Sequence, residues 1–407
     1  MPRSPQNFAT YGILSKILLI ALTFSSHIIL STSFANHGVQ VTKITEHMSN
    51  CVVSQQKRNA VKMSSIEYGL TIQTVGNPTL TNHLLESGVS ADLTLVLAAV
   101  SSACQELSGC IRTAAIQSIT GSSGGTNKGG DAQKKLDVVA NDILKVALAG
   151  CGGRVGVLAS EEEDEPVVLA EGAGKFCLVF DPLDGSSNID ASIPTGTIFG
   201  IYNTLEGKDG ETAESTALRS VLQPGKNLVA SGYCLYSAQT VLVLSWGQGT
   251  HGYTLDNLKG DFVLSHPNMK IPSRGRSYSL NEARFNDWPE GLKKYIGDMK
   301  TGKGQSGKEY DLVYICSLVG DVHYTYFRGG MACNPRSHLR LVYEGNPMGF
   351  VVEQAGGLAS TGVDRVLDVT PKQVHQRIPI FLGSEQDILE LESYGDVQQL
   401  GNKKYDV

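Results

Sequence analysis

The chain has 407 residues, of which 41% are hydrophobic and 18% are charged, and its formal net charge is −6. This composition is ordinary for a folded protein with a sizeable core, and without a long basic run nucleic acid is not an expected partner. Eight cysteines without a CxxC pair are too sparse for a disulfide scaffold. We therefore expect buried or incidental thiols in a reducing compartment.

The first 75 residues have the composition of a targeting leader. Arg3 precedes an apolar stretch whose most apolar part, residues 17–24, is too short to span a bilayer but suits a signal peptide. Residues 35–64 are rich in His, Lys, Arg and Ser, and Glu46 is their only acid, which is typical of a transit peptide. We predict a signal peptide over residues 1–33, cleaved before Phe34, and a transit-like leader over residues 34–75.

This order of segments resembles the bipartite leader of proteins imported into plastids bounded by four membranes. It predicts a location in the plastid stroma, without stable membrane insertion after processing. The alternatives are a plain secretory signal and an uncleaved N-terminal anchor.

Helices and strands alternate along the rest of the chain. Apolar side chains recur at helical spacing over residues 91–111 and, after a Gly/Ser/Thr/Asn loop at 121–130, over residues 136–147. Strands are predicted over residues 155–159, 175–180, 197–202 and 240–245, with a polar loop at 206–214. A helix over 341–355 would end at Gly356-Gly357, and Ser384 would cap a last helix over 385–391. The mixture predicts a layered α/β architecture.

Acidic residues recur where the predicted strands end and helices begin: Asp131, Asp137, Glu161, Glu162, Asp181, Asp184 and Glu344. Loops at strand ends are where α/β folds gather their sites, and carboxylate oxygens are the ligands that Mg²⁺ prefers. Taken singly, these acids could also be solvated loop residues or helix-start acids favoured by the dipole. Their order along the chain favours a site with two or three metal ions.

The step Gly185-Ser186-Ser187 follows Asp184 at a predicted helix start. Backbone N–H groups at such a start can hold a phosphate, although Ser186 and Ser187 alone would read as turn residues. Metal ligands beside a phosphate cradle indicate metal-assisted hydrolysis of a phosphoester.

FDPLDGSSNID, at residues 180–190, resembles the signature of the lithium-sensitive, metal-dependent phosphatase superfamily. A longer resemblance, over residues 76–396, is to the fructose-1,6-bisphosphatase family. It is carried by KKLDV at 134–138, SEE at 160–162, GTIFGIY at 196–202, LQPGKNLVASGY at 222–233, YSLNE at 278–282, SLVGDVH at 317–323, LRLVYE at 339–344, EQAGG at 353–357 and HQR at 375–377. Inositol monophosphatases carry a Trp-Asp motif where this chain has Tyr343-Glu344.

The resemblance implies a layered α-β-α-β-α sugar phosphatase fold with two fused subdomains. The first, residues 76–202, would hold the metal ligands, and the second, residues 203–396, would bind the sugar, followed by a tail over 397–407. It also implies hydrolysis of the 1-phosphate of fructose 1,6-bisphosphate and a homodimer or homotetramer. Chloroplast members of the family carry a loop with cysteines before the LQPG step. The corresponding segment here, 203–221, contains no cysteine, which argues against thioredoxin control through this loop.

The resemblance also assigns roles to single residues. It implies Mg²⁺, or Mn²⁺, bound by Glu161, Glu162, Asp181, the carbonyl of Leu183, Asp184 and Glu344. It implies a water activated by Asp131, Asp137 and Glu162, and a 1-phosphate held at Asp184, Gly185, Ser186 and Ser187 with support from Arg340. It places Asn281 and Tyr314 at the distal phosphate, and we predict that Arg284 and His338, which replace family residues there, also bind the substrate.

The departures from the family pattern concentrate at that distal phosphate. The family has Arg where this chain has Val313, Tyr where it has Arg284 and Asn334, and Lys where it has His338. Losing an Arg removes a bidentate phosphate contact, which Arg284 could replace. Two alternatives therefore stay open: sedoheptulose-1,7-bisphosphatase or another phosphate-ester hydrolase, and a catalytically weak paralogue that binds sugar phosphate.

Overall fold

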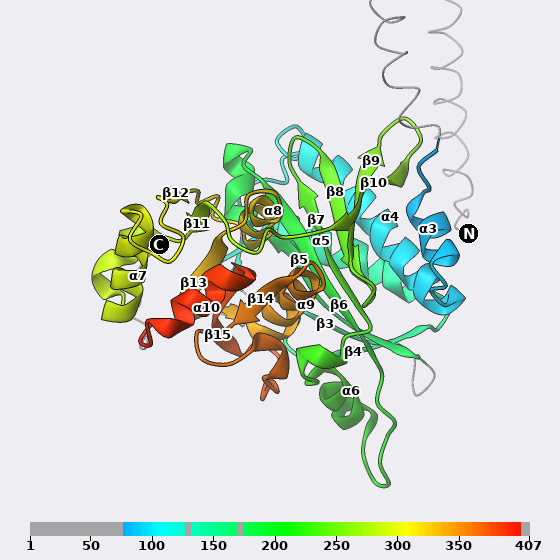
Figure 1. Cartoon of the computed structure of the whole chain (residues 1–407). Coiled ribbons are helices and arrows are strands. Elements are labelled where there is room, and N and C mark those ends of the chain that lie inside the picture. The colour runs from blue at the N-terminus through cyan, green and yellow to red at the C-terminus, as the bar shows by residue number, and fades with distance from the viewer. Residues whose placement is uncertain (1–75, 127–131, 170–173, 400–407) are drawn as a thin grey trace, which may run out of the picture. The chain divides into compact units, whose positions relative to one another are not determined.

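A computed structural model gives the fold of the chain and describes residues 76–126, 132–169 and 174–399 (Figure 1). The predicted signal peptide and transit-like leader, and the predicted catalytic residue Asp131, lie outside the described residues.

The larger sheet has eight strands in the order β10-β9-β8-β7-β6-β5-β3-β4. Their bounds are β3 Val155–Ser160, β4 Val167–Val168, β5 Phe176–Asp184, β6 Thr195–Asn203, β7 Ala230–Tyr236, β8 Thr240–Ser245, β9 Thr250–Asp256 and β10 Asp261–Met269. Only β3 and β5 pair in parallel, with Ser160 opposite Phe180. Because parallel strands end at the same edge of a sheet, the residues that follow Ser160 and Phe180 emerge side by side.

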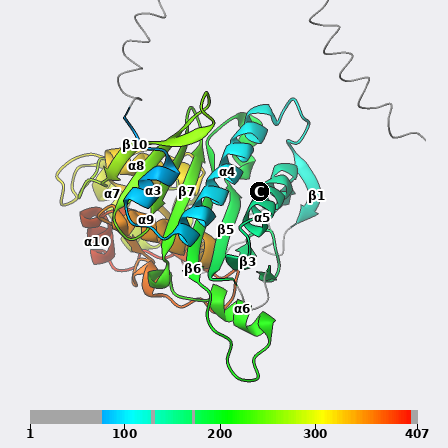
Figure 2. The ribbon, with the colours of Figure 1, turned by 90° about the vertical axis from the view of Figure 1, so that its right-hand side faces the viewer.

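Three helices cover one face of this sheet: α3 Leu80–Glu86, α4 Ala91–Thr113 and α5 Lys135–Ala149 (Figure 2). The Ser90 hydroxyl caps α4 by accepting a hydrogen bond of 3.3 Å from the Leu93 amide. The apolar stripes of α4 and α5, including Val100 and Leu144, are buried in the same core cluster as β5. Helix α4 has the length and composition to cross a membrane, but here that stripe is part of the protein core.

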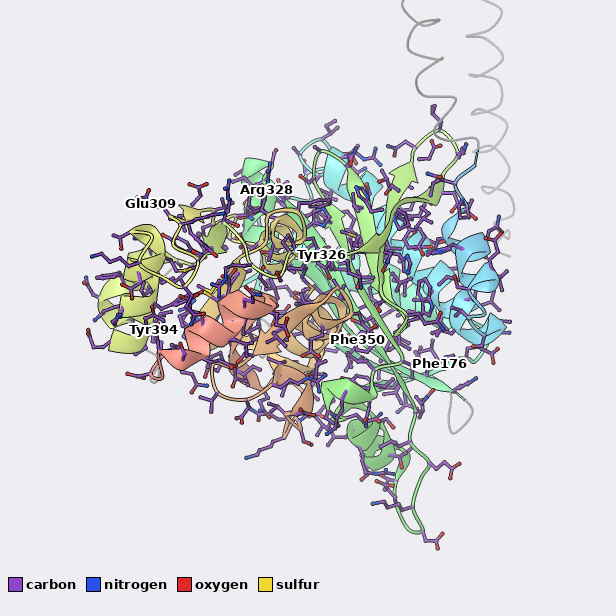
Figure 3. The ribbon with its side chains drawn as sticks, viewed as in Figure 1. Phe176, Glu309, Tyr326, Arg328, Phe350 and Tyr394 are labelled. Atoms are coloured by element: carbon purple, nitrogen blue, oxygen red, sulfur yellow. The ribbon has the colours of Figure 1, made fainter. Side chains whose placement is uncertain are left out.

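A second sheet has five strands in the order β12-β11-β13-β15-β14. Their bounds are β11 Ser277–Ser279, β12 Asp311–Leu312, β13 Met331–Arg340, β14 Gly357–Ser360 and β15 Arg377–Ser384. Two helices lie between the two sheets, α8 Leu318–Arg328 and α9 Asn346–Gln354, and the π-helix η4 Leu341–Gly345 directly precedes α9. Tyr326 of α8 and Phe350 of α9 are buried there (Figure 3). Helices α7 Glu290–Lys300 and α10 Glu385–Ser393 cover the outer face of the second sheet. The predicted layered α-β-α-β-α arrangement is confirmed.

Shorter elements connect these layers. They are β1 Ser122–Thr126, β2 Ala132–Lys134, η1 Ser186–Ala191, α6 Ala213–Val221, η2 Gly225–Asn227, η3 Glu282–Asp287 and η5 Val366–Asp368. The subdomain boundary proposed after Tyr202 lies inside β6, while the chain passes from the first sheet to the second between Met269 and Ser277.

Most of the predicted elements are present, with four differences. The predicted loop at 121–130 contains β1, which pairs with β2. The loop predicted over 206–214 is shorter, because α6 begins at Ala213. The helix predicted over 341–355 begins as η4 and becomes α9 only at Asn346. Ser384 precedes α10 as predicted but does not cap it, because its hydroxyl donates to the Pro272 carbonyl instead.

Candidate active site

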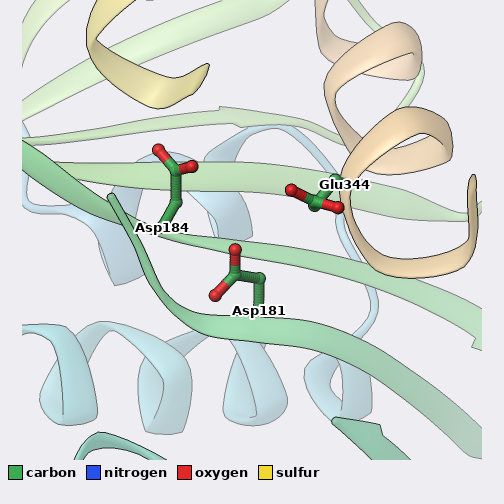
Figure 4. Close-up of side chains that lie close together, drawn as sticks. All are labelled: Asp181, Asp184 and Glu344. Carbon is green, nitrogen blue, oxygen red and sulfur yellow. The ribbon is translucent and has the colours of Figure 1, made fainter. Parts of the chain in front are cut away.

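Three buried carboxylates, those of Asp181, Asp184 and Glu344, meet between the larger sheet and η4 (Figure 4). One oxygen of each lies within 4.8 Å of the others. Asp181 and Asp184 come from β5, and Glu344 lies in η4. The amide of Leu183 donates a hydrogen bond of 2.9 Å to Asp181 Oδ1 and fixes the orientation of that carboxylate.

A bulge in β5 brings the two aspartates together. Residues three apart on a regular strand point to opposite faces. Here Asp181 is opposite Ile198 and Asp184 is opposite Gly196, so three steps along β5 match two steps along β6. The extra residue is a β-bulge, which turns Asp184 toward the side of Asp181.

The cluster holds more negative charge than its buried surroundings favour. Burial raises the pKa of Asp181 well above its ordinary value, and the neighbouring carboxylates raise it further. Burial also raises the pKa values of Asp184 and Glu344. Close carboxylates resist joint ionisation unless a cation lies among them. An all-oxygen donor set of this kind suits a hard divalent cation.

Arg340 joins a fourth acid to the cluster. Its Nη2 lies 2.6 Å from Glu161 Oε1, and its backbone amide donates to Glu344 Oε2. Arg340 is 5% exposed, so its guanidinium is a fixed positive charge beside the carboxylates. Glu161 directly follows β3, and Ser160 pairs with Phe180, so Glu161 lies beside Asp181 of β5.

A second group of polar side chains lies at the start of α5. Asp137 accepts a hydrogen bond of 2.7 Å from the Lys134 amide, and Glu162 accepts one of 2.5 Å from Gln133 Nε2. Burial raises the pKa of Asp137 to about 6, although hydrogen bonds from the Lys134 amide and the Ser186 hydroxyl lower that pKa in part. Asp137, Glu162 and Ser186 are therefore neighbours.

The turn after Asp184 packs tightly against α8. Gly185 has φ +72°, and a Cβ at this position would lie 2.8 Å from Ser317 Cβ. Ser186 begins η1, where it faces Asp137, whereas Ser187 is exposed. Only glycine combines this backbone conformation with this close approach.

The N-terminus of α8 holds Asp184, a role that was not predicted for this helix. Ser317 Oγ donates to Asp184 Oδ2 at 2.6 Å, and the Val319 amide donates to the same oxygen at 2.9 Å. Asp321, one turn later, accepts a hydrogen bond of 2.8 Å from the Ile315 amide. SLVGDVH was noted for its resemblance only, and the available signal was Ser317 as a helix N-cap with an acid in the first turn.

Comparison with known proteins decides the family. The family model for the fructose-1,6-bisphosphatase N-terminal domain matches residues 73–267, and the model for the C-terminal domain matches residues 271–396. The chain belongs to the fructose-1,6-bisphosphatase family.

Its relatives include plant proteins and solved structures. It is 45% identical over 335 residues to the chloroplastic fructose-1,6-bisphosphatase of Brassica napus, covering 78% of this chain and 81% of the relative. It is 40% identical over 407 residues to the chloroplastic enzyme of Pisum sativum, covering 92% and 100%. The crystal structure of Leishmania major fructose-1,6-bisphosphatase in holo form is 36% identical, with a TM-score of 0.74, covering 79% of this chain and 99% of that one.

Three of the four residues predicted at the distal phosphate lie together. Asn281, Arg284 and Tyr314 line one small cavity between η3 and β13, and Asn334 lines it as well. His338 lies on β13 two residues before Arg340 and is not among the residues that line this cavity. In this member of the fructose-1,6-bisphosphatase family, the altered residues Arg284 and Asn334 therefore share one pocket.

Proposed function

We propose that this chain hydrolyses the 1-phosphate of fructose 1,6-bisphosphate and releases fructose 6-phosphate and inorganic phosphate. The observation that carries the proposal is the buried cluster of Asp181, Asp184 and Glu344, within 4.8 Å of one another, directly before the Gly185-Ser186 turn. Metal ligands and a phosphate-binding turn side by side are what hydrolysis of a phosphoester requires. Membership of the fructose-1,6-bisphosphatase family supports the same reaction.

The cation that fits the donor set best is Mg²⁺, with Mn²⁺ as a substitute. Glu161, Glu162, Asp181, the Leu183 carbonyl, Asp184 and Glu344 would hold two or three such ions. When bound, these ions polarise the phosphoryl oxygens and lower the pKa of a bound water.

The protein groups would position the reactants. The amides of Gly185, Ser186 and Ser187 would bind the 1-phosphate, and Arg340 would offset its charge. Asp137 and Glu162, which lie beside Ser186, would orient the attacking water and accept its proton. The same role is proposed for Asp131.

Asn281, Arg284 and Tyr314 would hold the distal phosphate. Their cavity is linked to the metal cluster by a short segment of chain: Tyr314 lines the cavity, and Ser317, three residues later, contacts Asp184. His338 would contact the substrate from β13, between this cavity and Arg340.

A phosphate-release assay over a panel of esters tests the reaction. The panel comprises fructose 1,6-bisphosphate, sedoheptulose 1,7-bisphosphate, fructose 1-phosphate and inositol 1-phosphate, each with Mg²⁺. We expect the highest kcat/KM on fructose 1,6-bisphosphate. A higher kcat/KM on the sedoheptulose ester would reassign the substrate, and release from none of the esters would support the catalytically weak paralogue.

We also propose a location in the plastid stroma and a homodimer or homotetramer. The support for the location is the composition of residues 1–75 and the chloroplastic names of the plant relatives. Residues 1–75 fused to a fluorescent protein should direct it into plastids bounded by four membranes, and secretion of the fusion would contradict this. Sedimentation equilibrium would give the oligomeric state.

A further inference from the structure

Two arginines from different parts of the chain line the distal cavity. Arg284 belongs to η3 and Arg336 to β13, and both are partly buried. Asn281, Tyr314 and Asn334 add neutral polar groups, and none of the described lining residues is acidic. A pocket with two guanidinium groups and no carboxylate selects an anion, and guanidinium forks match the geometry of phosphate oxygens.

The chain beyond α10 returns to this cavity. The Gln399 amide donates a hydrogen bond of 2.8 Å to the Pro335 carbonyl, and Gln399 forms a parallel β-bridge with Arg336. Val397 is fully buried in the core cluster that contains Trp288 and Phe381, so it anchors the segment. The match to the family's C-terminal domain ends at residue 396, so Gln399 lies beyond it.

Gln399 is buried, lines the cavity and has one unsatisfied polar atom. The residue is 5% exposed and lines the cavity. Its Oε1 is buried and has no hydrogen-bond partner among the described residues. Leaving a buried carbonyl oxygen unpaired costs free energy, so such an atom is expected to gain a partner when a ligand binds. An amide side chain can accept from a sugar hydroxyl or, after rotation, donate to a phosphate oxygen.

The cavity is close enough to the metal cluster for one small substrate to reach both. Tyr314 lines the cavity and Ser317 contacts Asp184, and three residues of chain span at most about 10 Å. One small sugar ester with a phosphate at each end could therefore reach both places.

We infer that the segment after α10 forms part of the substrate site, where Gln399 and Arg336, together with Arg284, bind the distal phosphate end of a sugar bisphosphate. This inference rests on the proposed function and adds two residues that the family resemblance does not assign. All three side chains belong to one chain.

Binding of fructose 6-phosphate in chelator tests the inference, because this molecule carries only the distal phosphate. Calorimetry should show about tenfold weaker binding in Arg336→Gln, which loses a guanidinium–phosphate contact. Gln399→Leu should weaken binding about threefold or more, and Gln399→Glu should weaken it further, because its charge repels the phosphate. The matched controls Arg328→Gln and Gln398→Leu lie outside the cavity and should stay within about twofold of the unmodified protein.

Kinetics separate this role from a structural one. In Arg336→Gln and Gln399→Leu the KM for fructose 1,6-bisphosphate should rise while kcat changes little, and kcat/KM should fall less on fructose 1-phosphate than on fructose 1,6-bisphosphate. Unchanged affinity for fructose 6-phosphate in all three variants would overturn the inference, even if fructose 1,6-bisphosphate is hydrolysed. Arg336-dependent binding without hydrolysis would support the inference and overturn the proposed function. No binding of fructose 6-phosphate by the unmodified protein would overturn the inference.

Discussion

Ser317 Oγ donates a hydrogen bond of 2.6 Å to Asp184 Oδ2, and this contact joins the start of α8 to the carboxylate cluster. The Ser317 hydroxyl and the Val319 amide both donate to Asp184 Oδ2, so the protein fixes this oxygen. The other oxygen is then available to a cation. Gly185 controls the contact from the other side, because no side chain fits between its backbone and Ser317.

Gly185→Ala is expected to reduce catalysis more than stability. The added Cβ would lie 2.8 Å from Ser317 Cβ and would push the hydroxyl away from Asp184. The left-handed backbone alone costs about 1–2 kcal/mol for a non-glycine residue. We expect kcat/KM to fall by at least about tenfold, the loss that follows from one displaced charge-assisted hydrogen bond.

Gly210→Ala is the matched control for this change. Gly210 has φ +78°, close to that of Gly185, but a Cβ there meets no atom within 4 Å. Chemical denaturation and phosphate release measured on both variants should show a stability cost in both, larger in Gly185→Ala because of the clash with Ser317, and normal activity only in Gly210→Ala. Equal activity in the two variants would contradict the role given to the contact with Ser317.

Arg274→Met is expected to destabilise the second sheet strongly. Arg274 Nη1 lies 3.0 Å from Asp387 Oδ1 and also contacts Glu390, and both carboxylate side chains are fully buried. Removing the guanidinium leaves two buried acids without their cation, which typically costs about 3–5 kcal/mol. Arg365→Met, which breaks a more exposed pair with Glu353, should cost at most about 1 kcal/mol. Equal unfolding free energies for the two variants would refute the claim that the buried ion pairs of Arg274 contribute more than the exposed pair of Arg365.

The stability of the protein should fall between about pH 6.5 and pH 4 in part because of His323. Burial lowers the pKa of His323 to about 4, and its Nδ1 lies 2.9 Å from the Tyr233 hydroxyl. An unfolded histidine has a pKa of about 6.5. Between these values the unfolded chain binds more protons, so unfolding becomes easier as the pH falls. The contribution of His323 is on the order of 3 kcal/mol.

His323→Gln isolates this contribution from that of the carboxylates. Glutamine does not titrate but can still pair with the Tyr233 hydroxyl. Urea denaturation at pH 4.5, 5.5, 6.5 and 7.5 should give a shallower loss of unfolding free energy in the variant below pH 6.5. Parallel curves for the two proteins would show that His323 does not titrate as a buried neutral group.

Part of the metal cluster could be predicted from the sequence because its acids lie near the ends of strands. Glu161 follows β3 and Asp181 lies in the paired strand β5, so the parallel pairing of the two strands brings these two acids together. The bulge that turns Asp184 toward Asp181 could not be predicted, because it depends on the register with β6. The partnership of Ser317 with Asp184 spans 133 residues and depends on how α8 packs.

The distal cavity shows a different limit of sequence reasoning. Asn281 and Tyr314 were predicted there from family resemblance and Arg284 as a possible replacement for the missing Arg, and the structure brings the three together. Arg336 and Gln399 were missed, because one lies in a strand with shifted register and the other in a segment interpreted as a tail. Nothing in the local sequence around Gln399 indicates that it returns to β13, since the contact depends on the burial of Val397.

The central claim is that the cluster of Asp181, Asp184 and Glu344 binds the metal ions that drive phosphate release. The most direct test compares phosphate release from fructose 1,6-bisphosphate by the unmodified protein and by Asp184→Asn, with Mg²⁺ and with chelator. We predict turnover by the unmodified protein only with Mg²⁺ or Mn²⁺, inhibition by lithium, and a loss on the order of 10²-fold or more in a folded Asp184→Asn protein. Full activity in chelator, or near-normal turnover by the folded variant, would contradict the claim.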